Sequence, residues 1–140
     1  MSEDDFYNIQ VDMNNHEKAE APSSLVTYGL GPCIGIGVLD HDSGRGYLCH
    51  YGALANRPGG RAFFEDLKNC SQNVSIVVVG GDTSEDGPEG TDVITHRNET
   101  ISRLSMLFPK VTPGFHWSPA DGSSWIKVDL KAGEITHGLD

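Results

Sequence analysis

The chain has 140 residues, and its 20 acidic and 10 basic residues give a formal net charge of −10. This length is sufficient for one core, so we expect a single domain over residues 1–140, with a disordered tail at residues 1–5. An acidic surface repels phosphate backbones and anionic lipid headgroups, which argues against a nucleic-acid partner. The apolar runs are too short to cross a bilayer, and the first residues lack the features of a signal peptide. We therefore expect a cytoplasmic protein without membrane insertion.

The three cysteines, Cys33, Cys49 and Cys70, are expected to be free thiols. Their odd number and the lack of a close pairing motif argue against a disulfide framework. The sequence also contains no CxxC or HxxxH spacing typical of a zinc site. We expect neither a metal nor another cofactor.

The first part of the chain predicts strands and a hairpin. Alternating apolar residues predict a short strand over residues 7–11, and the polar residues 14–24 predict a loop. A second strand is predicted to begin at Cys33, which shares one strand face with Gly35 and Gly37. The turn-forming segment "DHDSGRG" then leads to a returning strand, "YLCHY".

The second part of the chain predicts two helices and three strands. "PGGRAFFEDLKN" and "VITHRNETISRLSMLF" have helical spacing of apolar residues, the latter with Thr91 or Asp92 as its cap. "VSIVVVGG" predicts a buried strand, and "WIKVDLKAGEITHG" predicts a terminal hairpin. The order of these elements predicts an α+β domain with a mixed or antiparallel sheet.

Cys33 lies in a segment, "GLGPC", that restricts the backbone in an unusual way. Gly29 and Gly31 can adopt positive φ angles, and Pro32 stiffens the entry into the strand. The glycines further along the Cys33 face carry no side chains, so either a substrate or a packed neighbouring strand can approach there. Cys49 and Cys70 are predicted to have structural roles.

A cysteine acts as a nucleophile in its thiolate form, and a neighbouring histidine is the usual activator. If the hairpin turn is centred between residues 41 and 42, Cys33 and His50 are directly opposed, with Cβ atoms about 4.5–5.5 Å apart. A turn centred two residues later would place His50 opposite Gly37, roughly 13 Å along the strand from Cys33. We predict the first register, with His50 as the partner of Cys33.

The segment "TYGLGPCIGIGVLD" resembles the active-site signature of the CheD family of chemoreceptor glutamine deamidases, T-L-G-L-G-S-C-V followed by a strand. His50 falls on the histidine of that family's H-F-M-L-P segment. "ITHRN" and "IKVDLKAGEI" resemble two later family segments, I-G-E-R-N and V-K-F-D-L-K-T-G-E-V. The matches run in order from Leu25 to Ile135, and the first motif is the specific one.

The resemblance implies two packed β-sheets with helices on the outside, and an activity that converts glutamine side chains of a protein to glutamate. It implies that Cys33 is the nucleophile, His50 the general base and Thr27 the third catalytic residue. The backbone N–H groups of Gly31 and Cys33 are the expected oxyanion donors. The implied partners are a glutamine-bearing protein, a chemoreceptor or another protein, and a CheC-like phosphatase.

The sequence also departs from the family pattern. Pro32 replaces a serine and has no N–H, so any donor role at that position is lost. The segment after His50 and the "THRN" segment differ as well. The main hypothesis is therefore a cysteine-dependent protein-glutamine deamidase, and the alternative is a CheD-like binding module with weak or no activity. Transfer to an amine and a redox-sensing thiol are further alternatives.

Overall fold

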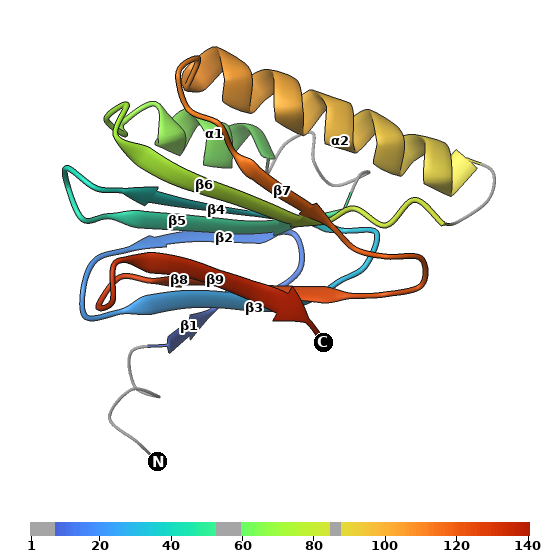
Figure 1. The fold of residues 1–140 in the computed structure, drawn as a ribbon, viewed down its shortest axis with the longest axis horizontal. Coiled ribbons are helices and arrows are strands. Elements are labelled where there is room, and N and C mark those ends of the chain that lie inside the picture. Colours follow the sequence, from blue (N-terminus) through green and yellow to red (C-terminus); the bar gives the residue numbers. More distant parts are fainter. Residues whose placement is uncertain (1–7, 53–59, 85–87) are drawn as a thin grey trace.

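The computed structural model describes residues 8–52, 60–84 and 88–140, and the expected tail at residues 1–5 lies outside this range. The described residues form two sheets and two helices (Figure 1). The elements are β1 (Asn8–Gln10), β2 (Asn15–Ala19), β3 (Ser24–Leu30), β4 (Ile34–Asp40), β5 (Gly46–Tyr51), α1 (Arg61–Leu67), β6 (Val74–Gly80), α2 (Pro88–Leu107), β7 (Gly114–Trp117), β8 (Ser124–Asp129) and β9 (Glu134–Leu139).

One sheet has the strand order β1-β3-β8-β9 and the other has the order β2-β5-β4-β6-β7. The pairs β1/β3 and β6/β7 are parallel, whereas the remaining pairs are antiparallel. Both sheets are therefore mixed. The prediction of two packed mixed or antiparallel sheets with helices on the outside is confirmed.

The five-stranded sheet is the middle layer of the fold, with α1 and α2 on one face and the four-stranded sheet on the other (Figure 1). Every residue of β4 is buried because both faces of this strand are covered. Ile36, Cys49 and Phe63 belong to the core on the helix side, and Leu48 and Ile126 belong to the core between the sheets. Within the described ranges, neither helix has the length and apolar character needed to cross a membrane.

The bare face of β4 lies against the four-stranded sheet. A Cβ atom on Gly35 would lie 2.7 Å from Cδ1 of Leu30, and one on Gly37 would lie 3.0 Å from Cδ1 of Ile126. These separations are shorter than normal carbon–carbon contacts. The sequence left open whether a substrate or a neighbouring strand approaches this face. In the structure, residues of the opposite sheet occupy the space.

The predicted hairpin register is wrong by two residues. Gly35, and not Cys33, is the residue opposite His50. The turn is centred between residues 42 and 43, because Gly44 has a φ of 73° and the Asp40 N–H donates to the Arg45 carbonyl at 2.9 Å. Gly44 supplies the positive φ that closes the loop at this place, because glycine adopts that conformation without steric cost. The alternative register, with His50 opposite Gly37, is also wrong.

Three strands lie where none is predicted. β2 occupies the predicted polar loop, and most of its residues are exposed because it is an edge strand held by backbone pairing with β5. β3 and β7 are the other two. The second helix also begins earlier than the predicted cap at Thr91 or Asp92: α2 starts at Pro88, a residue suited to a first helical turn.

Candidate functional site

Thr27 and His50 meet across the two sheets. Thr27 lies on β3 and His50 lies on β5, and only 1% and 5% of their surfaces are exposed. The Thr27 Oγ1 atom is 2.7 Å from His50 Nδ1 and donates its hydrogen to the Val11 carbonyl, also at 2.7 Å. A hydroxyl has one hydrogen, so His50 must donate its Nδ1–H to Thr27. This chain of bonds fixes the imidazole in one tautomer.

The opposite ring nitrogen, His50 Nε2, carries the lone pair in this tautomer. Nε2 is buried and has no hydrogen-bond partner among the described residues. An unpaired buried polar atom costs about 1–3 kcal/mol and is uncommon in native proteins. His50 is therefore an oriented base whose Nε2 lone pair is not used by a hydrogen bond within the described structure.

Cys33 directly precedes β4 and faces the same side of the sheet as His50. Its residue is two positions before Gly35, the partner of His50, and alternate residues share a strand face. The half-buried thiol packs with the core between the sheets, and a Cβ atom on Gly52 would lie 3.7 Å from its sulfur. Cys33 is thus a diagonal neighbour of His50, for which typical separations are about 7–8 Å.

Burial keeps both groups of this pair neutral at rest. Burial raises the pKa of the Cys33 thiol. It also lowers the pKa of His50, and the negative charge of Asp12 partly opposes this second shift. No hydrogen bond to Nε2 is formed from the thiol. The resting arrangement is therefore a thiol beside a neutral imidazole, and proton transfer must accompany attack.

The backbone around Cys33 is held by the end of β6. The Gly81 N–H donates to the Cys33 carbonyl at 2.9 Å, and the Asp82 N–H donates to the Gly31 carbonyl at 2.8 Å. Gly80 has a φ of 91°, and its missing side chain leaves room for the Cys33 carbonyl, which a Cβ atom there would overlap. These contacts fix the position of Cys33 without using its side chain.

β3 becomes irregular between Thr27 and the Cys33 loop. Its pairing register with β8 shifts between Thr27 and Leu30, and Gly29 there has a φ of 69°. The Gly31 N–H donates to the Gly29 carbonyl at 3.1 Å. Gly31 would have to leave this bond to serve as the predicted oxyanion donor, so the Cys33 N–H is the better candidate.

Arg97 is a residue near the site that was given no role on sequence grounds. Its Nε–H donates to the Gly81 carbonyl at 2.7 Å, and its guanidinium lies 4.5 Å from the ring centroid of Trp117. Arg97 thus connects α2 to the segment that holds Cys33. The signal for it is the "THRN" segment, which resembles a family motif but does not by itself indicate this contact.

The other two cysteines lie away from this constellation. Cys49 is buried in the core on the helix side, and burial strongly raises the pKa of its thiol. Burial also raises the pKa of Cys70, to about 11. In the described part of the chain, no three histidine, cysteine or acidic side chains converge on a place that could hold a metal ion.

One segment of the chain is similar in sequence to a known protein. Over 42 residues it is 45% identical to the probable chemoreceptor glutamine deamidase CheD 2 of Geobacter metallireducens, covering 30% of this chain and 26% of that protein. No family model matches the chain. Among solved structures, the hypothetical protein YfiH of Bacillus licheniformis superposes with a TM-score of 0.46 at 9% identity, over 76% of this chain and 51% of YfiH. The sequence similarity is therefore to a probable deamidase of the CheD type, within less than a third of the chain and about a quarter of that relative.

Proposed function

We propose that the protein is a cysteine-dependent protein-glutamine deamidase of the CheD type, with Cys33 as the nucleophile and His50 as the general base. The observation that carries this proposal is the His50 imidazole, which Thr27 orients and whose Nε2 has no partner in the described structure. A half-buried thiol on the same face supplies the nucleophile that such a base activates. The similarity to a probable glutamine deamidase supports a carboxamide as the reacting group.

In the first half of the reaction, Cys33 attacks the carboxamide carbon of a glutamine side chain. His50 Nε2 takes the thiol proton as the carbon–sulfur bond forms, and the carbonyl oxygen becomes an oxyanion. The imidazolium then gives that proton to the amide nitrogen, which leaves as ammonia. A thioester between Cys33 and the substrate remains.

In the second half, water replaces ammonia at the same place. His50 Nε2 takes a proton from the water as its oxygen attacks the thioester carbon. The carbon–sulfur bond breaks, the proton returns to the sulfur, and glutamate is released. Thr27 acts through His50 in both halves, because it keeps the hydrogen on Nδ1 and the lone pair on Nε2.

The fixed loop at Cys33 supports oxyanion stabilisation. Each tetrahedral intermediate needs N–H donors that are already oriented, and the Cys33 N–H belongs to a backbone held by Gly81 and Asp82. Pro32 stiffens the same loop but supplies no donor. Because this backbone is already fixed, the Cys33 N–H does not have to be reoriented during the reaction.

Ammonia release from a glutamine-bearing protein tests the proposal. The parent chain should release ammonia and convert the glutamine to glutamate, which mass spectrometry detects as the amide-to-acid change. Cys33→Ala should lower this rate at least about 1,000-fold, because covalent catalysis is lost. Cys70→Ser is the matched control and should keep the parent rate. Equal rates for the parent and Cys33→Ala would refute the proposal.

The alternative is a binding module that keeps the fold but has weak or no turnover. The raised pKa of Cys33 and the lack of a thiol–Nε2 hydrogen bond favour it. A chemoreceptor fragment or another glutamine-bearing protein that binds equally to the parent and to Cys33→Ala, without conversion of any glutamine, would support this alternative. An added amine incorporated in place of water would instead identify acyl transfer to amines.

A further inference from the structure

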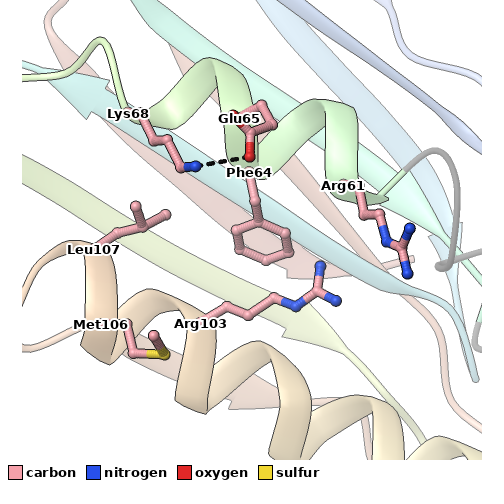
Figure 2. Close-up of a pocket in the computed structure, with 7 residues that line it drawn as sticks. All are labelled: Arg61, Phe64, Glu65, Lys68, Arg103, Met106 and Leu107. Carbon is pink, nitrogen blue, oxygen red and sulfur yellow. Dashed lines mark hydrogen bonds and ion pairs between the residues drawn. The ribbon is translucent and has the colours of Figure 1, made fainter.

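A groove separates α1 from α2 on the outer face of the helical layer. Its volume is about 380 Å³, and Figure 2 shows the side chains of the two helices facing one another across it. Both helices begin at the end of the molecule where the loop between β3 and β4 lies (Figure 1). The groove lies in the helical layer, whereas Cys33 and His50 lie between the two sheets. Arg61 lines the groove at the start of α1.

The floor and one rim of the groove are apolar. Phe64 is buried beneath it, and Leu107 and Met106 form the apolar part of the α2 side. Met106, near the end of α2, is 83% exposed, so its side chain is accessible to a partner at the groove. This thioether can adapt to the shape of an inserted apolar side chain.

The groove carries positive charge on a strongly negative protein. Arg61, Lys68 and Arg103 line it, and Glu65 is the one acidic side chain among the described residues of its lining, whereas the whole chain has a net charge of −10. Lys68 is paired with Glu65 at 2.7 Å, so the two arginines are the main source of the local positive charge. The Arg103 guanidinium lies 5.2 Å from the ring centroid of Phe64, which holds this cation beside the apolar floor.

From this combination we infer that the groove docks an acidic segment of another protein. One apolar side chain of that segment packs on Phe64, Met106 and Leu107, and flanking carboxylates pair with Arg61 and Arg103. Charge complementarity selects this occupant, because the remaining acidic surface repels such a segment and steers it to the groove. The inference is independent of the chemistry at Cys33.

The test is fluorescence anisotropy with two labelled peptides that differ only in charge. Both have one leucine-rich helical face, flanked by glutamates in the first peptide and by lysines in the second. The parent chain should bind the glutamate peptide and not the lysine peptide. Arg61→Glu/Arg103→Glu should weaken binding at least about tenfold, and Met106→Ser should weaken it about threefold.

The matched control is Lys127→Glu/Lys131→Glu, which makes the same change in net charge. Lys127 lies on β8 and Lys131 in the turn that follows it, on the other sheet, so binding should change less than about twofold. Cys33→Ala should bind like the parent, which separates docking from any failure of the proposed activity.

Four outcomes overturn the inference. They are no binding of the glutamate peptide, equal weakening by both charge-reversal variants, binding of phosphatidylserine vesicles without binding of the peptide, and self-association that Arg61→Glu/Arg103→Glu abolishes. The third would identify a lipid surface and the fourth a second copy of the chain.

Discussion

Cys33 directly precedes β4 and Cys49 lies on the neighbouring strand β5, yet they face opposite layers. Cys33 precedes β4 and points toward the four-stranded sheet, as does His50 on the neighbouring β5. Cys49 is the residue beside His50 in sequence, but strand alternation directs it into the apolar core under the helices. Burial raises the pKa of both thiols. The difference is therefore in what surrounds each sulfur.

This comparison shows that a lowered thiol pKa is not required for the proposed site. Cys49 is fully enclosed, and the imidazole of its cross-strand partner, His16, is already hydrogen-bonded through Nδ1 to the Tyr51 hydroxyl. Cys33, in contrast, is half-buried and faces His50, whose Nε2 has no hydrogen-bond partner in the described part of the chain. A thiol of either kind is inert by itself at neutral pH. The unpaired nitrogen of the neighbouring imidazole and the partial exposure of the thiol, and not the resting charge of the sulfur, distinguish the proposed nucleophile from the structural cysteine.

The largest expected difference between the two cysteines is their rate of alkylation. In the folded protein at pH 8, iodoacetamide should modify Cys33 at least about 1,000-fold faster than Cys49, because Cys49 becomes accessible only when the core opens. Peptide mapping by mass spectrometry measures both rates in one sample. Comparable rates for the two thiols would contradict the burial difference on which the comparison depends.

The next effect concerns the hydrogen bond between Thr27 and His50, the imidazole that faces Cys33. Thr27→Val should lower the deamidation rate constant about 100-fold, since His50 loses the acceptor that fixes its tautomer. Thr27→Ser keeps the hydroxyl and should restore the rate to within about threefold. Nitrogen NMR of the labelled imidazole should show a mixture of tautomers in Thr27→Val alone. An unchanged tautomer in Thr27→Val would show that Thr27 does not fix the tautomer of His50.

The pH dependence gives a smaller and graded effect. Because burial lowers the pKa of His50, kcat/KM should stay constant as the pH falls to 6.5 and should decrease about tenfold per unit only below the lowered value. Folding stability should also decrease below pH 6.5, since the unfolded chain then binds a proton that folded His50 does not. Denaturation measured at each pH separates the two effects. An acid limb above pH 6.5 would contradict a neutral resting imidazole.

The smallest effect is expected from the structural cysteine. Cys49→Ala should leave the deamidation rate within about twofold of the parent and lower the free energy of unfolding by about 1–2 kcal/mol, because it leaves a small cavity in the core. Urea denaturation and the ammonia assay together measure this. A large loss of rate with normal stability would show that the helix side of the sheet also takes part in the reaction.

Much of the fold was predictable because apolar periodicity is local. The pair β4 and β5, both helices, β6 and the terminal hairpin each have such a pattern. β2 has none, because an edge strand with exposed side chains is held by backbone hydrogen bonds that leave no mark on residue type. The hairpin register depends on where the turn is centred within "DHDSGRG", and the residue types of that segment allow more than one centre.

The candidate site was predictable in part. The strand faces correctly placed Cys33 and His50 on one side of the sheet, although the separation along the strands was wrong by two residues. Thr27 could not be derived from periodicity, because its contact with His50 joins two different sheets and depends on tertiary packing. The contact of Arg97 with Gly81 is of the same kind.

The bare strand face at Gly35 and Gly37 has a consequence for engineering this protein. Gly35 is the residue paired with His50, and even one methyl group there would press against Leu30 of the opposite sheet. Such a wedge would lengthen the bond between the threonine hydroxyl and the imidazole, which bridges the same gap. The tautomer of His50 thus depends on the lack of side chains at Gly35 and Gly37, which lets the two sheets approach closely. Substituting either glycine is a way to weaken the Thr27–His50 hydrogen bond without changing either partner.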